Sequence, residues 1–273
     1  MHSEVAVQPS AWTEPVPRFS FLRAMAAVTE GEVRKLLHDP IEIVGRIIQP
    51  TVWIMIFAPV FSSFHMLQGG NLRYIDYIVP GILAQSVLFI SVIYGVGLLW
   101  ERDLGLLQKF LVSPASRGAL VLGKAIASGL RNLPQIVIVY ILASFATVKL
   151  RWNPLSLLAV MVLVILGSGL FCMISMLVAC IMKNRERFLG VNQLLTAPVF
   201  FASNALYPLT LMPWWLRKIC IFNPLTYIVD GLRGCMLAKG HSTYGLWLDF
   251  LIPIPMIALL VMLTAWFYPR VEY

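Results

Sequence analysis

Residues 155–182 read LSLLAVMVLVILGSGLFCMISMLVACIM, an apolar run without a charged side chain. A helix needs about 20 apolar residues to cross the hydrocarbon core of a bilayer, so this stretch predicts a transmembrane span. Other apolar runs of spanning length lie on both sides of it, at residues 43–64, 76–99, 120–148, 188–209 and 246–268. Together these segments predict an all-α polytopic membrane protein with six transmembrane helices.

The composition also indicates a membrane protein. Of the 273 residues, 59% are hydrophobic and 12% are charged, whereas soluble domains average about 45–50% apolar and about 25% charged residues. The net charge is +8, but the 21 Lys and Arg residues are scattered between apolar segments, so no nucleic-acid partner is expected. The four cysteines contain no CxxC pair and the four histidines are far apart, so no metal site is expected.

The chain begins with segments that do not span. Residues 1–18 contain three prolines among polar residues and lack the apolar core of a signal peptide, which indicates a flexible cytoplasmic tail. Residues 19–39 place apolar side chains on one helical face and charged ones on another, as an amphipathic interfacial helix does. The alternative is an extension of the first span, because Pro40 can bend a helix without ending it. Residues 19–273 are predicted to form a single transmembrane domain.

The distribution of Lys and Arg predicts the orientation in the membrane. If the N-terminus is cytoplasmic, 14 of the 21 basic residues fall on the cytoplasmic side, where such residues are enriched. Four of the remaining seven lie in residues 210–245. Both termini are therefore expected in the cytoplasm.

Residues 101–117, ERDLGLLQKFLVSPASR, interrupt the apolar pattern between the second and third spans. Leu104, Leu107 and Leu111 recur at i, i+3 and i+7, which predicts a short cytoplasmic helix with one apolar face. Such a face suits a shallow groove on a partner, and the charges at its start and at Lys109 can set the register. The alternative is a loop helix that rests on the membrane.

Residues 210–245 form a second interruption. Trp214 and Trp215 stand beside two basic residues, a combination typical of the membrane interface. The stretch 225–237 is too short and too polar to span, because Asp230 and Arg233 would both enter hydrocarbon. We therefore expect a pair of half-inserted outer helices that close the top of a cavity before the last span.

Two details of the same segment can be checked in a structure. Asp230 and Arg233 are three residues apart, which predicts an ion pair on one helical face. Cys220 and Cys235 are expected on the oxidising side, but buried free cysteines are common, so a disulfide between them is the less favoured interpretation.

Residues 118–125, GALVLGKA, come close to the phosphate-binding loop GxxxxGK[ST]. Ala125 stands where that loop needs a hydroxyl for magnesium, and residues 120–122 continue a spanning helix. The chain also has no soluble segment long enough for a nucleotide-binding domain. We therefore do not expect it to hydrolyse ATP.

The order of these parts resembles the membrane subunits of type 2 ABC exporters, the permeases that serve drug-resistance, antibiotic and polysaccharide export. An interfacial helix and two spans precede the ERDxGxL…LxSPxSR segment, and four spans follow it, with an NPLTY…DGLR segment before the last. The resemblance covers the chain from about Phe19 to Tyr268.

The resemblance implies a permease dimer joined to two copies of a separate cytoplasmic ABC ATPase, in the inner membrane of a bacterium. ATP and Mg²⁺ would be held by the ATPase, with no cofactor on this chain, and a drug-like, lipid or glycan substrate would move outward. A second copy of the chain is favoured over a different chain as the partner permease. Residues 19–39 and 101–117 would contact the ATPase, the latter through Glu101, Arg102, Asp103, Leu104, Leu107, Lys109, Phe110, Leu111 and Arg117.

The resemblance also implies a substrate route and an outer gate. The route would lie between the permeases, near the second and fifth spans, where the polar candidates are Gln85, Ser86, Tyr94, Asn192, Gln193 and Asn204. The outer gate segment would contain Asn223, Pro224, Tyr227, Asp230 and Arg233. Polar side chains in spans also serve helix packing, and this alternative stays open for each route residue.

Two other classes of function remain as alternatives. An ion-coupled secondary transporter needs ionisable residues or broken helices at mid-membrane, and prolines 50, 59, 134 and 198 could break spans. A membrane enzyme acting on lipid-linked substrates needs acid and base groups that converge near the interface. The acidic residues near the predicted interfaces are few and no histidine joins them, so the chain is not expected to be an enzyme.

Overall fold

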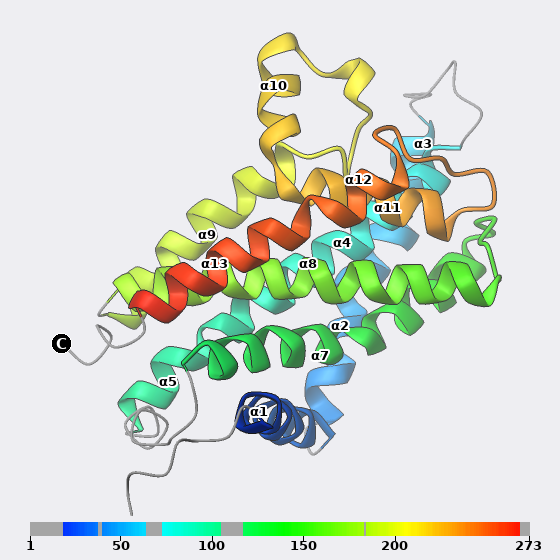
Figure 1. Cartoon of the computed structure of the whole chain (residues 1–273). Helices are drawn as coiled ribbons and strands as arrows, with labels where there is room; N and C mark the ends of the chain where they lie inside the picture. The colour runs from blue at the N-terminus through cyan, green and yellow to red at the C-terminus, as the bar shows by residue number, and fades with distance from the viewer. Residues whose placement is uncertain (1–18, 38–39, 64–72, 105–116, 183, 268–273) are drawn as a thin grey trace, which may run out of the picture.

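The structure is a computed structural model that describes residues 19–37, 40–63, 73–104, 117–182 and 184–267. Within these ranges the chain is helical, and the β-contact is an isolated antiparallel bridge between Leu150 and Leu237. Figure 1 shows α7 (Arg117–Phe145), α8 (Pro154–Ile181) and α13 (Pro253–Phe267) side by side across the view.

Four helices are long and apolar enough to cross a membrane, namely Tyr74–Glu101, Gly118–Phe145, Pro154–Ile181 and Leu246–Phe267. They confirm the apolar helices predicted at 76–99, 120–148, 155–182 and 246–268. The first consists of α4 (Tyr74–Gly95) and α5 (Gly97–Asp103), and the last consists of α12 (Leu246–Leu251) and α13.

The predicted first span is a helix in three parts. These are α2 (Pro40–Thr51), the π-helix η1 (Val52–Phe57) and α3 (Ala58–Ser63). Pro50 lies just before the π-helix; it has no N–H to donate, and its ring crowds the preceding turn, so the regular pattern gives way to wider turns there. The apolar part, Val44–Val60, is shorter than the four long helices.

The predicted fifth span, 188–209, is wrong in its bounds. Its helix, α9, runs over Arg185–Phe201, and residues 202–208 leave the helix. The side-chain amide of Asn223 donates to the carbonyls of Val199 and Ala202, at 2.6 and 3.0 Å, so the end of α9 bonds to a neighbouring element instead of continuing. The described residues thus contain four helices of spanning length and one shorter apolar helix, Val44–Val60, besides α9, and a six-span arrangement stays a prediction.

The amphipathic N-terminal segment forms its own helix, α1 (Phe19–Leu37). In Figure 1, α1 is seen nearly end-on while α2 runs from the bottom of the view toward its top, so the two helices point in different directions. The side-chain hydroxyl of Thr29 on α1 donates to the carbonyl of Gly123 on α7, at 3.2 Å. The segment is therefore a separate helix that packs on α7, and it is not an extension of the first span.

The segment 210–245 contains the 3₁₀-helix η2 (Leu209–Leu211) at its start and two short helices, α10 (Trp214–Phe222) and α11 (Pro224–Met236), as predicted. They differ sharply in burial. The α10 helix projects from one end of the molecule (Figure 1), and Trp214 and Phe222 are among its exposed side chains. Every residue of α11 from Leu225 to Met236 is buried.

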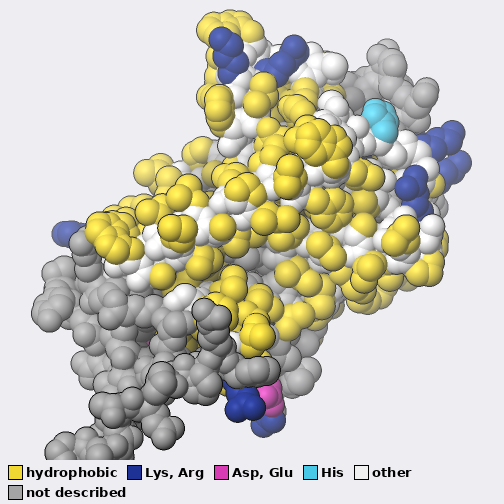
Figure 2. Space-filling view, in the orientation of Figure 1, with side chains coloured by type: hydrophobic (Ala, Val, Ile, Leu, Met, Phe, Trp, Pro, Cys, Tyr) yellow, Lys and Arg dark blue, Asp and Glu magenta, His cyan; other side chains and the backbone are white. Residues whose placement is uncertain are grey.

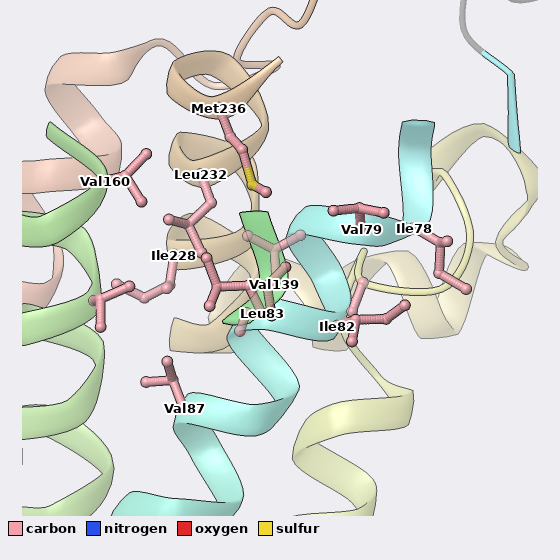
Figure 3. Close-up of a cluster of buried hydrophobic side chains, with 14 of the residues drawn as sticks. Ile78, Val79, Ile82, Leu83, Val87, Val139, Val160, Ile228, Leu232 and Met236 are labelled. Carbon is pink, nitrogen blue, oxygen red and sulfur yellow. The ribbon is translucent and has the colours of Figure 1, made fainter. Parts of the chain in front are cut away.

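The α11 helix belongs to the main hydrophobic core. Figure 3 shows its Ile228, Leu232 and Met236 beside side chains of α4, among them Leu83. Val139 of α7 and Val160 of α8 complete the same cluster. Within the outer segment, α11 is therefore wedged between the long helices and does not rest loosely on top of them.

The surface divides into an apolar middle and charged ends. In Figure 2, hydrophobic side chains cover the face formed by α7, α8 and α13, whereas Lys and Arg side chains gather near α10 and near α1. Only 11% of the apolar window of Leu246–Phe267 is buried inside the structure. This distribution suits a chain whose middle faces lipid and whose ends face water.

Candidate functional site

At the α1 end of the molecule, a buried ion pair joins α5 to α7. The ammonium of Lys124 donates to both carboxylate oxygens of Glu101, at 2.6 and 2.5 Å, and both residues are buried. A buried charge is costly without a partner, so each residue requires the other. Glu101 was expected to offer its charge to a partner protein, but in this structure the carboxylate is bound internally.

An apolar cluster also holds α5, next to the Glu101–Lys124 ion pair. Leu98 and Leu99 form one cluster with Val121 of α7 and Phe188 of α9, and α8 contributes the sulfur-containing residues Cys172, Met173, Met176 and Cys180. The start of the predicted contact segment is therefore fixed to three other helices.

The rest of the predicted contact segment is described only at its edges. Leu104 is 69% exposed, as expected for a residue that meets a partner. Asp103 is also exposed. Leu107, Lys109, Phe110 and Leu111 lie outside the described residues, and the side chains of Arg102 and Arg117 are not described. Their roles stay predictions.

The near-match to a phosphate-binding loop lies inside α7. Residues 118–125 all lie in α7, so the backbone N–H groups from Val121 onward bond within the helix and cannot cradle a phosphate. This supports the rejection of the motif.

The six predicted route residues do not share one environment. Gln85, Ser86 and Asn192 are buried within the chain, Tyr94 is half-buried and Gln193 is exposed. The amide of Asn192 donates to the Ser175 hydroxyl at 2.9 Å, and Ser175 donates to the carbonyl of Val92 at 2.7 Å. These contacts tie α9 and α8 to α4, which is the packing role that was left open.

At the α10 end, the carboxylate of Asp230 organises the residues before the last span. It accepts from the backbone N–H of Thr243 at 2.6 Å, from that of Tyr244 at 2.9 Å and from the Thr243 hydroxyl at 3.0 Å. The Arg233 guanidinium lies 3.7 Å away, which confirms the predicted ion pair. Asp230 is fully buried, so these four groups take the place of water around its charge.

Arg233 connects α11 to α4 and to the chain after α9. Its guanidinium lies over the Tyr77 ring, 3.8 Å from the centroid, and donates to the carbonyl of Asn204 at 3.0 Å. The Tyr77 hydroxyl donates to the same carbonyl, also at 3.0 Å. Asn204, one of the predicted route residues, thus links α11 to α4 through its backbone carbonyl.

Asn223 starts α11 and attaches it to α9. Its side-chain oxygen accepts from the backbone N–H of Leu225 at 3.0 Å, and Pro224 occupies the first helical turn, where no N–H is needed. The Tyr227 hydroxyl donates to the carbonyl of Ile221 at 2.7 Å, which folds α10 back against α11. All five predicted outer gate residues therefore lie in or at the start of α11.

Burial changes the acidity of groups in this region that lie outside the long helices. It raises the pKa of the half-buried Tyr244 hydroxyl to about 12. It also raises the pKa of the Cys220 thiol, although the Thr226 hydroxyl 3.1 Å away acts in the opposite direction. Cys220 and Cys235 are both free, in agreement with the favoured interpretation.

Several residues of this region were missed in the sequence. Ser242, Thr243 and Tyr244 lack any helical periodicity, and their role depends on the loop folding back to Asp230. Asp249 did carry a signal, because it is the single charged residue in residues 246–267.

Comparison with known proteins identifies the family. Residues 23–237 match the profile of the family described as ABC-2 type transporter. The chain belongs to the ABC-2 type transporter family. The matched region begins within α1 and ends just after α11, so it includes both the predicted ATPase-contact segment and the outer gate segment.

Individual relatives of this ABC-2 chain are distant but extensive. A protein named transport permease ycf38, from Cyanophora paradoxa, is 28% identical over 236 residues, which cover 84% of this chain and 78% of the relative. The daunorubicin resistance ABC transporter permease protein DrrB1 of Streptomyces coeruleorubidus is 22% identical over 211 residues, covering 77% and 72%. The inner membrane transport permease YadH of Escherichia coli is 21% identical over 238 residues, covering 84% and 90%.

These relatives are transport subunits, and the ABC-2 chain is accordingly a multi-pass membrane subunit of an ABC transporter. The family implies an ABC ATPase subunit as its partner. Among the described residues, no three His, Cys, Asp or Glu side chains are grouped closely enough to hold a metal ion.

Proposed function

We propose that the chain is the permease subunit of an ATP-driven exporter in a bacterial inner membrane, with both termini in the cytoplasm. Two permeases, two copies of the same chain in the favoured arrangement, would work with two ATPase subunits that hold ATP and Mg²⁺. The cargo would be a drug-like, lipid or glycan molecule, and the name of the relative DrrB1 favours a drug-like one.

The proposal rests on the contacts that join both predicted ATPase-contact regions, residues 101–117 and α1, to the helix α7. The Glu101–Lys124 pair joins the start of the predicted contact segment to α7, and the Thr29–Gly123 hydrogen bond joins α1 to the same helix. Both predicted ATPase contacts therefore act on one long helix. A displacement imposed at residues 101–117 or at α1 would move α7, which runs to the opposite end of the molecule (Figure 1).

In the proposed mechanism, ATP binding closes the two ATPases and rocks the permeases between inward and outward openings. The cargo must bind more weakly in the outward form, because a ligand with equal affinity for both states cannot be moved by their exchange. The α11 helix, wedged between α4 and α8, would be displaced whenever those helices separate.

The test is to isolate the tagged full chain from its native membrane in a mild detergent, identify the proteins that remain bound and assay ATP hydrolysis. We expect a stoichiometric cytoplasmic ATPase and vanadate-sensitive hydrolysis. A tagged copy should also retain an untagged copy of the same chain. Isolation of the chain alone, folded and without ATPase activity, would contradict the proposal and favour an ion-coupled transporter.

A further inference from the structure

Two fully buried carboxyl groups meet at one serine near the start of the last long helix. Asp230 of α11 and Asp249 of α12 both have no exposed surface. The hydroxyl oxygen of Ser242 lies 3.2 Å from Oδ2 of Asp230 and 2.7 Å from Oδ2 of Asp249. The backbone N–H of Gly245 donates to the same hydroxyl oxygen at 2.7 Å.

The hydrogen bonds distinguish the two acids. Asp230 has two backbone N–H donors, the Thr243 hydroxyl and a guanidinium, so its surroundings suit a carboxylate. Oδ1 of Asp249 has no hydrogen-bond partner, and its Oδ2 contacts only the Ser242 hydroxyl. Since a serine hydroxyl carries a single hydrogen, Ser242 cannot donate to both acids at once.

The charges around Asp249 lead to the same conclusion. The facing helix α11 presents Asp230 and Arg233, with Tyr227 and Cys235 as further titratable groups. The helices α8 and α13 contain no charged residue, and α12 contains none besides Asp249. Two ionised carboxylates beside one guanidinium would leave one negative charge unbalanced in a buried site, where such a charge is very costly.

We propose that Asp249 is a proton-binding site whose neutral carboxyl donates to the Ser242 hydroxyl, while Ser242 donates to the carboxylate of Asp230. In this arrangement every hydrogen has an acceptor, and the unpartnered Oδ1 is the carbonyl oxygen of a neutral acid. The bound proton joins the last long helix to α11 through the loop 242–245. Thr243 is exposed and Ser242 is half-buried, so the proton can exchange with water at the α10 end.

The packing supports a close approach at this point. A Cβ atom placed on Gly231 of α11 would lie 3.0 Å from the Cβ atom of Asp249, so the base of the Asp249 side chain is held directly against the α11 backbone. Ionisation of Asp249 would place its charge near that of Asp230 without room to move away. Loss of the proton is therefore expected to loosen the contact between the last helix and α11.

Infrared spectroscopy of the purified full chain in lipid nanodiscs tests the proposal directly. At pH 6 we expect a protonated-carboxyl C=O band that shifts in D₂O, is lost in Asp249→Asn and moves in frequency in Asp249→Glu. The control is Asp76→Asn, because both oxygens of Asp76 accept from Arg73 and no protonated form is expected there. A wild-type spectrum without the band, or a band retained in Asp249→Asn, would overturn the assignment.

Thermal unfolding gives a second readout that does not depend on transport. The unfolded chain ionises its aspartates above about pH 4, whereas folded Asp249 keeps its proton, so the folded state binds more protons. Stability contributed by this site must then fall as pH rises. The Asp249→Asn variant keeps a donor for Ser242 at every pH. The melting temperature of the wild type should therefore fall relative to that of the variant between pH 5 and pH 9. A difference between the two proteins that does not change with pH would contradict the proposal.

Discussion

Lys124 and Glu101 pair across the two ends of the predicted ATPase-contact segment. Glu101 is the first residue of the segment 101–117, Lys124 lies on α7 seven residues after its end, and the ammonium contacts both carboxylate oxygens within 2.6 Å. The ends of the segment are thereby held together inside the protein. A force applied to the segment from the cytoplasm would reach α5 and α7 at the same time.

Replacing Glu101 by Gln should destabilise the chain, because the ammonium of Lys124 would remain buried without a counter-charge. The expected loss is on the order of 3 kcal/mol, measured as a lower melting temperature of the purified protein. The control is Glu30→Gln. Glu30 and its partner Arg34 are both largely exposed, so the loss of stability in this variant should be below about 1 kcal/mol. The exchange Glu101→Lys with Lys124→Glu should recover part of the loss. An unchanged melting temperature in Glu101→Gln would show that the pair contributes little.

A charge on the apolar face of the contact segment should uncouple the transporter. In Leu107→Asp or Phe110→Asp, we expect ATPase binding and export to be lost while the chain still reaches the membrane, because a carboxylate cannot enter an apolar groove without a large desolvation cost. Gln108→Asp adds the same charge at a position next to this face and should retain activity. Normal export by a verified Leu107→Asp protein would refute the assignment of the contact.

Asn223 and Asn153 allow a matched comparison, because both are followed by Pro and Leu and both cap a helix. Asn153→Ala removes only the cap of α8, at an exposed position, and should cost about 1 kcal/mol. Asn223→Ala also leaves the half-buried carbonyls of Val199 and Ala202 without their donor, and should cost about 3 kcal/mol. The free energies of unfolding of both variants, monitored by intrinsic fluorescence, give the difference. Equal losses would mean that the link from α11 to α9 adds no stability.

Gly81 marks a point where α4 approaches another backbone too closely for a side chain. A Cβ atom at this position would come within 2.9 Å of three backbone atoms of Ala205. Gly81→Ala should therefore displace residues 202–206 and cost about 3 kcal/mol. Gly169→Ala is the control, because its nearest neighbours would be 3.7 Å away, and its melting temperature should stay the same or rise. Comparable melting temperatures for the two variants would contradict the packing.

The thiols at the α10 end should react slowly and in a pH-dependent manner. Burial raises the pKa of both Cys220 and Cys235 above the ordinary value, and the thiolate is the reactive form. At pH 7 their alkylation by a water-soluble maleimide should be at least about tenfold slower than that of Lys239→Cys, an exposed position, and should accelerate as pH rises. Rapid labelling at pH 7 would show that α10 and α11 open readily.

Much of the architecture could be predicted from the chain alone. The four long apolar helices, an amphipathic helix at residues 19–37 and the two short helices within 210–245 all follow from apolar run length, period and breaker residues, whereas the separation of the first helix from the first span was left open. The end of α9 could not be predicted, because residues 202–208 are apolar enough to continue a helix. They stop because Asn223, Tyr77 and Arg233, from two other elements, donate to the backbone carbonyls of Ala202 and Asn204.

The candidate site divides in the same way. The spacing of Asp230 and Arg233 was enough to predict their ion pair, because three residues bring two side chains together on any helix. The pairs Glu101–Lys124 and Asp249–Ser242 join residues that no local period connects, and they are visible only in the folded chain.

The sequence by itself determined that this protein is an all-helical membrane subunit of the ABC-2 family, because apolar length and the order of segments are properties of the linear chain. The tertiary structure alone decided which of its few charged residues are buried and what each one contacts. The burial of a charge depends on neighbours brought from distant segments, and these neighbours give Asp230 several hydrogen-bond donors but leave Asp249 with the Ser242 hydroxyl alone.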